Sequence, residues 1–447
     1  MRSHHTTTLL RRAGRLAATA SLAALAMGFA GSASAQTLTI ESWRNDDADV
    51  WNSKIIPAFN KQHPNIKVQF KADPPTEYNA ALNARLAGGT AGDLITCRPF
   101  DASLDLFKKG QLLPVNDVKG IENFSDVAKS AWSTDDGRTT FCMPMASVIH
   151  GFIYNKEVFD ELKLTPPKTV KEFHAVLDKI KADGKYTPIA MGTADQWEAA
   201  TMGFQNIGVN YWKGEEGRKA LIEGKQKLTD PAYVQTFAEL ASWAPYMGNG
   251  YQSQKYPDTQ NLFTLGRAAI YPAGSWDVPI FRKQADFEFD AFAPPVPDGA
   301  SKCYISDHTD IALGINAKSK NAEAAKTFIT WATDKAYTEL VASKEGWANV
   351  PPGTRTSLYE NQNYLDAAAF ADEAKAAMDA ADITKPTVQP VPYTGGQFVA
   401  IPEFQGIGTS VGQIFSAVVA GQSSVDDALA QAQSAATREM TRSGYIK

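Results

Sequence analysis

Ser410 lies in the short motif of this chain that most resembles a catalytic site. Residues 408–412 are Gly-Thr-Ser-Val-Gly, the pattern that places a nucleophilic serine on a sharp turn between a strand and a helix. In enzymes built on that turn the catalytic histidine follows the serine, whereas the last histidine here is His308. The pattern therefore indicates small residues packing on a helix rather than nucleophilic catalysis.

Other reactive motifs are absent from the sequence. No Gly-x4-Gly-Lys-Ser/Thr loop could bind nucleotide phosphates, and the glycine after Gly406 and Gly408 comes at Gly412, one position late for a dinucleotide loop. No His-Glu-x-x-His, Cys-x-x-Cys or calcium-loop pattern offers metal ligands, so neither a metal nor a cofactor is predicted. A glycosidase needs only two well-placed carboxylates, which leaves a secreted carbohydrate-active enzyme as the remote enzymatic alternative.

The chain has three cysteines, Cys97, Cys142 and Cys303. An oxidising compartment would permit one disulfide and leave one thiol over. Their spacing does not show which two would pair. Burial of all three as small apolar side chains is the alternative.

Residues 1–35 are predicted to be a cleavable signal peptide. An apolar, alanine-rich run over 16–29 precedes Ala-Ser-Ala at 33–35, the small-residue pattern of a cleavage site. No cysteine follows directly, so no lipid anchor is expected. The segment begins with four positively charged residues: Arg2, Arg11, Arg12 and Arg15.

Charge and hydropathy limit the partners of the remaining chain. The whole sequence has a formal net charge of −5, and the signal segment carries four arginines and no acidic residue, so the mature protein is more acidic still. An acidic surface argues against nucleic acid or anionic lipid as the partner. No later stretch has the ~20 consecutive apolar residues of a membrane span.

The first part of the mature chain alternates between strand and helix patterns. Strands are expected at 37–40, 66–70 and 93–96, and helices around Trp51–Phe59 and Tyr78–Leu86, with Pro57 kinking or delaying the first helix. This order implies a parallel sheet covered on both faces, hence an α/β fold. Ligands of such sheets gather beyond the carboxyl ends of the strands, so the loops after Ile40 and Thr96 are the first site candidates.

Helix-capping signals mark three further helices. Thr169 with Glu172, and Ser424 with Asp427, have the spacing of a capping box. Asn321 precedes an apolar pattern and is expected to cap the helix that follows it.

A series of segments then points to a known family. In order along the chain they are 38–43, 59–68, 86–95, 112–115, 142–144, 153–159, 166–173, 266–276 and 315–329. Together they resemble the extracellular solute-binding proteins of family 1, whose best-known member is the maltose-binding protein. The resemblance covers nearly the whole mature chain.

The resemblance implies a periplasmic binding protein type II fold, in which two α/β lobes joined by a hinge enclose a ligand cleft. Lobe 1 is expected to comprise 36–146 plus 312–350, and lobe 2 to comprise 147–311 plus 351–447. The protein would then be a periplasmic monomer without enzymatic activity. It would capture a sugar by hinge closure and deliver it to an ABC permease and its ATPase.

Sugar receptors combine aromatic platforms with planar polar groups, and the predicted site residues follow that chemistry. In lobe 1, Trp43 is a candidate platform or rim-packing residue, and Arg98 with Asp101 is a ligand-binding pair or a structural salt bridge. The full set of predicted ligand-binding residues is Trp43, Arg44, Asn45, Asp46, Arg98, Asp101, Asp195, Trp197, Trp276, Asp277, Asp307, His308, Trp347 and Asn349.

The expected ligand is a disaccharide or small oligosaccharide. Residues 406–412 lack the late platform aromatic of maltose-type sites, which argues against a long malto-oligosaccharide. A polyol, a sugar phosphate or an organic acid is the alternative, with Arg98 as the clamp for an anion.

Overall fold

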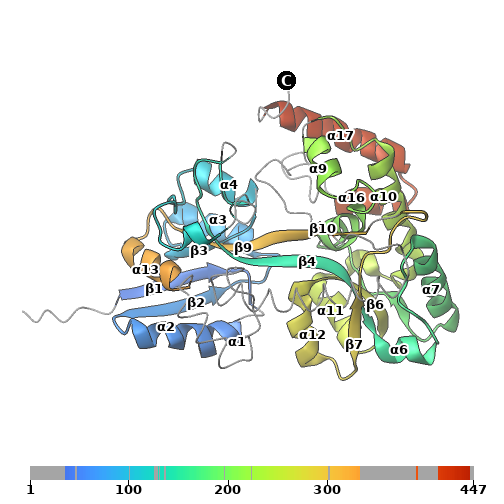
Figure 1. The fold of residues 1–447 in the computed structure, drawn as a ribbon, viewed down its shortest axis with the longest axis horizontal. Coiled ribbons are helices and arrows are strands. Elements are labelled where there is room, and N and C mark those ends of the chain that lie inside the picture. The colour runs from blue at the N-terminus through green and yellow to red at the C-terminus, as the bar shows by residue number, and fades with distance from the viewer. Residues whose placement is uncertain are drawn as a thin grey trace, which may run out of the picture.

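The protein is described here from a computed structural model. The structure describes residues 36–45, 48–99, 101–124, 129, 131–134, 137–195, 197–222, 224–300, 303–332, 389–390 and 411–442. Two α/β lobes lie side by side and are joined by two long strands (Figure 1). Within the described ranges, no helix combines the length and apolar character that crossing a membrane requires.

Lobe 1 contains the predicted parallel sheet. β1 (Gln36–Ser42) lies between β2 (Ile66–Ala72) and β3 (Leu94–Cys97) and is parallel to both. The strand–helix–strand–helix–strand prediction is therefore confirmed, with each strand slightly longer than expected. The helical elements of this lobe are α1 (Ala48–Val50), η1 (Trp51–Ile55), α2 (Ile56–Gln62), α3 (Tyr78–Gly88), α4 (Asp101–Lys108), η2 (Ile121–Asn123) and α13 (Ala322–Ala332).

Pro57 shapes the first helix, as its ring chemistry predicts. The chain passes from α1 through a π-helical turn, η1, and Pro57 then lies in the first turn of α2, where a missing N–H leaves no hydrogen bond unmade. Trp51 and Ile55 in the π turn are both buried. The Trp51 ring stacks on Phe70 with centroids 4.7 Å apart. The irregular turn thus keeps the apolar face of the helix against the sheet.

Two strands cross between the lobes. β4 (Met143–Asn155) pairs with β9 (Asp307–Ile315) through its first half and with β6 (Ala268–Gly274) and β7 (Phe289–Phe292) through its second. Its first residues belong to the lobe 1 core and its last residues to the lobe 2 core. A register shift interrupts the β4–β9 pair around Ala146. Two of the predicted lobe boundaries, at 146/147 and 311/312, fall within this pair and stay predictions, and the third, at 350/351, lies outside the described residues.

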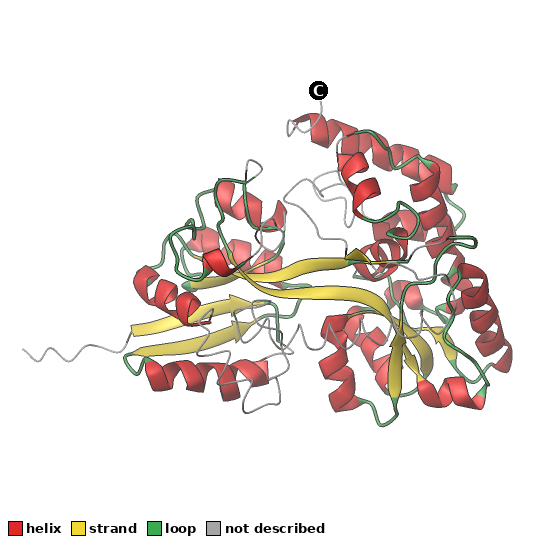
Figure 2. Ribbon diagram, viewed as in Figure 1, coloured by secondary structure: helices red, strands yellow, loops and turns green. Residues whose placement is uncertain are grey.

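The strand order through both lobes is β2-β1-β3-β9-β4-β6-β5, with β7 also on β4 (Figure 2). The other elements of lobe 2 are α6 (Lys156–Glu161), α7 (Val170–Asp183), β5 (Thr187–Ile189), η3 (Glu198–Gln205), α8 (Asn206–Gly208), α9 (Glu215–Ile222), α10 (Pro231–Ser242), η4 (Ala244–Tyr246), η5 (Tyr251–Ser253), α11 (Tyr256–Thr264), η6 (Ser275–Asp277), α12 (Val278–Gln284), β8 (Tyr304–Ile305), β10 (Gln389–Pro390), α16 (Val411–Val419) and α17 (Val425–Arg442).

The capping predictions have different outcomes. The box of Thr169 and Glu172 is present at the start of α7, and the Ser424 hydroxyl accepts from the Asp427 N–H at 3.1 Å before α17. Asn321 instead uses its side-chain amide to bond the Thr37 carbonyl, which ties α13 to β1. Ser410 lies outside the described residues, immediately before α16.

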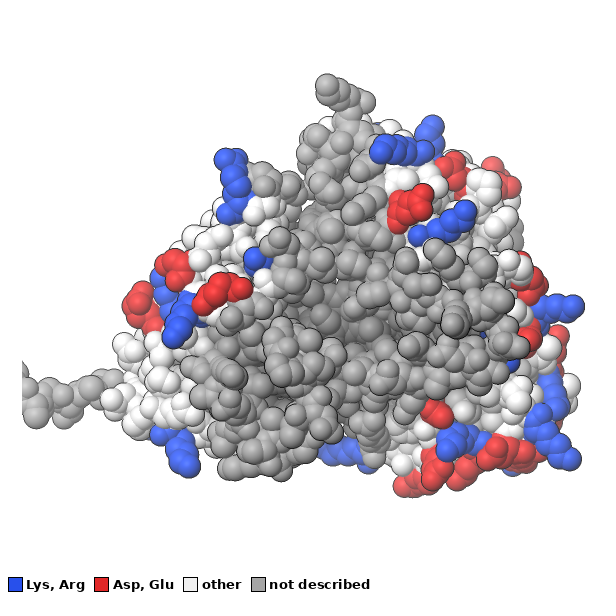
Figure 3. All heavy atoms as spheres, in the orientation of Figure 1, with Lys and Arg blue, Asp and Glu red and all other residues white. Residues whose placement is uncertain are grey.

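Charged side chains of both signs lie on the surface (Figure 3), and one pair of them joins the two lobes. Figure 3 shows acidic and basic side chains interspersed over the described part of one face. At the side of the molecule where α1 faces α12 (Figure 1), the Lys283 ammonium lies 3.1 Å from the Asp49 carboxylate. This pair joins the two lobes, and both side chains are exposed, so its contribution to stability is small.

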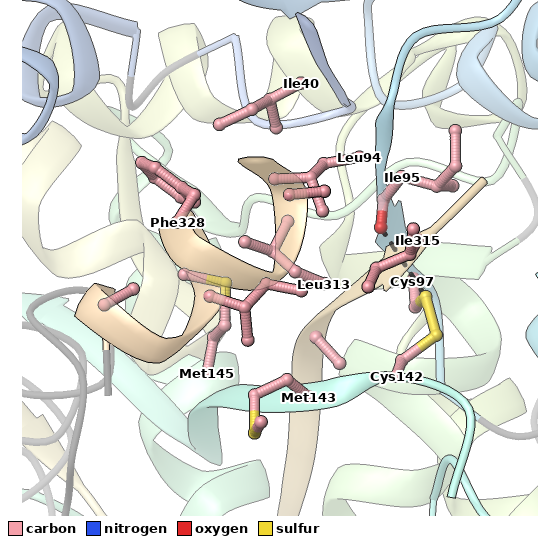
Figure 4. Packing of buried hydrophobic residues seen from close by; sticks show 14 of the residues in the cluster. Ile40, Leu94, Ile95, Cys97, Cys142, Met143, Met145, Leu313, Ile315 and Phe328 are labelled. Atoms are coloured by element: carbon pink, nitrogen blue, oxygen red, sulfur yellow. Dashed lines mark hydrogen bonds between the residues drawn. A yellow bond between two sulfur atoms is a disulfide. The ribbon is translucent and has the colours of Figure 1, made fainter. Parts of the chain in front are cut away.

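A disulfide joins Cys97 to Cys142 inside lobe 1, the pairing that sequence could not assign. It connects the end of β3 to the residue before β4, beside Leu313 and Ile315 of β9 (Figure 4). Both cysteines are fully buried, and a side chain at Gly314 would meet both sulfur atoms. Cys303 is a free, buried thiol whose pKa is raised by burial. The disulfide therefore fastens β3 to the start of a crossing strand.

Removing this disulfide is expected to destabilise the protein. Cross-linking two residues 45 positions apart restricts the unfolded chain by about 4 kcal/mol in the loop-entropy model. A reductant should lower the urea midpoint of the wild-type protein and leave that of the Cys97→Ala/Cys142→Ala variant unchanged. Cys303→Ala is the matched control and should keep the response to reductant. An unchanged wild-type midpoint would contradict the assigned bond.

Candidate functional site

The first predicted loops lie at the end of the lobe 1 sheet that points toward lobe 2 (Figure 2). Trp43 follows β1, and Arg98 follows β3, so parallel pairing brings the two side chains together. The Arg98 guanidinium lies over the Trp43 ring, 4.4 Å from its centroid. The Tyr78 ring also packs against Trp43, with the two ring centroids 5.5 Å apart. Because only 4 % of Trp43 is exposed, its ring is mostly used in packing.

Arg98 is held by neighbours within lobe 1. Its Nε donates to Asn79 Oδ1 at 3.0 Å, and its Nη2 donates to the Pro75 carbonyl at 2.7 Å. The Trp132 indole donates to the Arg98 carbonyl at 3.1 Å. These bonds tie the loop after β3 to the start of α3, and they give Arg98 a structural role whatever else it contacts.

The strongest convergence of predicted residues is in lobe 2. Trp197 immediately precedes η3, and Trp276 lies in η6 directly after β6, yet their ring centroids are 6.4 Å apart. Tyr256, the first residue of α11, lies edge-on to Trp197 at 4.8 Å. Trp276 needs the glycine of its Gly-Ser-Trp segment, since a Cβ at Gly274 would come within 2.0 Å of the indole.

Two predicted carboxylates bond directly to Tyr256. Asp195 Oδ2 accepts from the Tyr256 backbone N–H at 2.8 Å, and Asp277 Oδ1 accepts from the Tyr256 hydroxyl at 2.5 Å. The Trp276 indole N–H donates to the same hydroxyl at 2.9 Å. We call Asp195, Trp197, Tyr256, Trp276 and Asp277 the aromatic–acid cluster. Prediction from sequence identified every member except Tyr256.

Glu198 lies beside this cluster and is completely buried. Burial raises its pKa to about 8, with a smaller contribution from the negative charge of Asp195. Hydrogen bonding agrees, because the Thr259 hydroxyl lies 2.9 Å from both Glu198 Oε1 and the Tyr256 carbonyl. That hydroxyl has one proton and can donate to only one of them. A proton on Glu198 satisfies both contacts, so the neutral acid fits the site.

Tight packing of two loops positions these residues. The loop after β5 lies against the loop before α11, and a Cβ at Gly192 would come within 2.3 Å of the Gln254 carbonyl oxygen. The Thr193 N–H donates to the Tyr251 carbonyl at 3.1 Å. His150 of β4 adds an edge-on contact with Trp276 at 5.4 Å, and its Nδ1–H donates to the Thr201 carbonyl at 3.1 Å. Sequence gave no signal for Tyr256, Glu198 or His150.

The remaining predicted residues are dispersed. Arg44 is buried, and its backbone N–H donates to the Ser42 hydroxyl, whereas Asn45 is exposed. Asp101 begins α4, while Asp307 and His308 begin β9 and pair in register with residues 149 and 148 of β4. Asp46, Trp347 and Asn349 lie outside the described residues.

A cavity of about 440 Å³ lies beside, rather than in, the aromatic–acid cluster. It is an open cavity lined by α16, by Thr193 and by Tyr251 of η5, and its other lining includes Gln252 and Gln413. None of the cluster residues lines it. The cluster is therefore distinguished by its chemistry, not by the volume around it.

The two-lobed fold can be compared with known proteins, and the comparison shows the family of the chain. The chain belongs to the bacterial extracellular solute-binding protein family, whose profile matches residues 44–339. It is 35 % identical to the mannitol-binding protein of Pseudomonas aeruginosa, over 92 % of this chain and 95 % of that one. It is 23 % identical to the multiple sugar-binding protein of Streptococcus mutans, over 75 % and 80 %.

Solved structures give the same fold. An ABC transporter solute-binding protein from Agrobacterium vitis, with bound D-mannitol, matches with a TM-score of 0.65 and 31 % identity, over 92 % of this chain and all of that chain. A chitin oligosaccharide binding protein matches with a TM-score of 0.70 at 19 % identity, over 91 % and 99 %. The latter supports the fold alone.

These findings confirm the resemblance and the predicted two-lobed type II fold. The protein is a bacterial extracellular solute-binding protein, and its family implies a periplasmic or extracellular location. The related proteins are receptors rather than enzymes, which argues against the secreted hydrolase alternative. The predicted oligosaccharide ligand gains no such support from the mannitol-binding protein or from the structure with bound D-mannitol, both of which exceed 30 % identity.

Glu198 should make the stability of the protein fall with rising pH. Its pKa is about 8 in the folded protein against an ordinary value of 4.5, so between these pH values only the unfolded chain loses the proton. The contribution is complete below the lower value and lost as pH rises through the upper one. Glu198→Gln, which stays neutral, should be relatively more stable than wild type at alkaline pH.

Urea unfolding at about pH 5 and about pH 8 would measure this difference. The exposed Glu216→Gln variant controls for the change in net charge. Equal pH slopes for wild type and Glu198→Gln would show that Glu198 is ionised in the folded protein.

Proposed function

We propose that this protein captures an acyclic polyol, with mannitol as the first candidate, and delivers it to an ABC permease. The observation that carries the proposal is the agreement of two relatives. One is named for mannitol and the other was solved with D-mannitol bound, and each matches at least nine-tenths of this chain. The proposal replaces the expected oligosaccharide with the polyol alternative.

The aromatic–acid cluster has suitable chemistry for such a ligand. A polyol offers many hydroxyl donors along a flexible chain, and carboxylates are acceptors that strengthen such bonds. Asp195 and Trp197 are only partly buried, so they can offer a carboxylate and a ring face to the ligand, whereas Asp277 is fully buried and acts through its bonds to Tyr256 and Gln260. We place the ligand against this wall of lobe 2.

Charge favours a neutral ligand over an anionic one. Asp195, Glu198 and Asp277 are close enough for the charges of the two aspartates to raise the pKa of Glu198. A phosphate or carboxylate group on the ligand would be repelled by the same charges. Arg98, the candidate anion clamp, is already bonded to Asn79 and Pro75. A neutral polyol thus fits better than a sugar phosphate or an organic acid.

Closure of the lobes would complete the site. The β4–β9 pair is the connection about which the lobes can move, and lobe 1 presents the loops after β1 and β3 toward lobe 2 (Figure 1). A ligand held on lobe 2 favours the closed form only through added contacts with lobe 1. The loaded, closed form would be the one recognised by the permease.

Mannitol is expected to raise the melting temperature of the mature protein, because a ligand that binds only the folded state stabilises it by mass action. At a hundredfold excess over Kd the stabilisation is about 2.7 kcal/mol. Trp276→Ala should weaken binding at least about tenfold, since it removes a ring contact. Trp276→Phe should retain part of the affinity. Calorimetric titration with mannitol, sorbitol, maltose and raffinose would measure the preference, and tighter binding of a ring sugar would contradict the proposal.

Phosphorylation of the polyol should abolish most of its affinity. One added negative charge about 6 Å from a carboxylate costs about 100-fold in affinity at an effective dielectric constant of 20. Mannitol 1-phosphate should therefore compete with mannitol only weakly in a displacement titration. Tighter binding of the phosphate would instead indicate an anion site, and Arg98→Gln would then be expected to abolish it.

A further inference from the structure

Tyr256 links the members of the aromatic–acid cluster more directly than any residue found from the sequence. Its backbone N–H, its ring and its hydroxyl each contact a different part of the cluster. We propose that Tyr256 is the positioning residue of the ligand site, whose hydroxyl holds Trp276 and Asp277 in the orientation that the polyol requires. This inference rests on the proposed function.

The backbone of Tyr256 is itself well anchored. It begins α11 with Pro257 next in the chain, and its N–H bonds Asp195 at 2.8 Å. A second hydrogen bond caps the same helix start: the Lys255 backbone N–H donates to Asp258 Oδ2 at 2.9 Å. The ring therefore projects from a fixed point, and movement of Tyr256 would also disturb the loop that carries Trp197.

The Tyr256 hydroxyl can both donate and accept a hydrogen bond, and its two neighbours need one of each. The indole N–H of Trp276 can only donate, and an ionised Asp277 carboxylate can only accept. A hydroxyl can accept from the first and donate to the second, as the distances of 2.9 Å and 2.5 Å show. Trp276 and Asp277 are consecutive, so one hydroxyl bonds two adjacent side chains of the cluster.

The residues that make these hydrogen bonds are buried, so losing one of the bonds is costly. Asp277 is fully buried, and Tyr256 and Trp276 are 8 % and 9 % exposed. In such surroundings a donor or acceptor that loses its partner is poorly compensated by water. Without the hydroxyl, the indole and the carboxylate would reorient toward other partners, which changes the surface offered to the ligand.

The arrangement also assigns a role to Trp276. Its only polar hydrogen is used on Tyr256, so the residue offers the ligand a ring face rather than a hydrogen-bond donor. Asp277 Oδ1 likewise accepts from both Tyr256 and Gln260, the latter at 3.0 Å. Tyr256 thus decides which chemical features of the cluster remain available for recognition.

The test uses Tyr256→Phe, which keeps the ring and removes only the hydroxyl. Tyr233→Phe is the matched control, because it removes a buried hydroxyl that donates to the Gly217 carbonyl at 3.1 Å in a different core of lobe 2. Both variants should remain folded by circular dichroism. Calorimetric titration with mannitol should show a Kd about 10- to 100-fold higher for Tyr256→Phe and unchanged for Tyr233→Phe.

A second readout distinguishes positioning from general destabilisation. In protein labelled with 5-fluorotryptophan, the Trp276 fluorine resonance, assigned with Trp276→Phe, should shift in ligand-free Tyr256→Phe and stay in place in Tyr233→Phe. Unchanged affinity or an unchanged Trp276 resonance in Tyr256→Phe would overturn the inference. Wild-type protein that binds no polyol would overturn the proposed function, and the inference with it.

Discussion

The antiparallel pairing of β4 with β9 connects the two lobes and contributes residues to both of their cores. β4 places its first residues in the core of lobe 1 and its last in the core of lobe 2, so neither lobe is complete without it. The strand directions leave lobe 1 with the carboxyl ends of β1 and β3 facing lobe 2. The Cys97–Cys142 bond reinforces this pair from the lobe 1 side, where it lies against Gly314 of β9.

In lobe 2 the same strand supplies His150 to the aromatic–acid cluster, so the connection between the lobes and the cluster share one element. The cluster holds its polar groups by internal hydrogen bonds, which is the condition for burying carboxylates near each other. Glu198 meets that condition by keeping its proton, and Asp277 by accepting from Tyr256 and Gln260. These internal bonds fix the orientation of the buried polar groups, so little reorganisation of the cluster is left to be made on binding.

Much of this could be predicted from the sequence. The alternating strands, the capping box at Thr169 and the signals of an α/β order depend on neighbouring residues, and the structure contains them. Four of the predicted site residues, Asp195, Trp197, Trp276 and Asp277, do converge, because each follows a strand or turn whose place in the sheet the resemblance supplied. Trp43 and Arg98 also meet, although mainly in packing with each other.

Local patterns and their order along the chain were enough to predict the strands and helices, the protein family and the lack of catalytic motifs. The pairing of the cysteines, the raised pKa of Glu198 and the contacts of Tyr256 arise from packing in three dimensions. Each of these depends on contacts between residues far apart in the chain, such as Tyr256 with Trp276 and Glu198 with Thr259. A tyrosine at a helix start has no local feature that reveals its neighbours, because burial and hydrogen-bond partners arise only when the loops pack together.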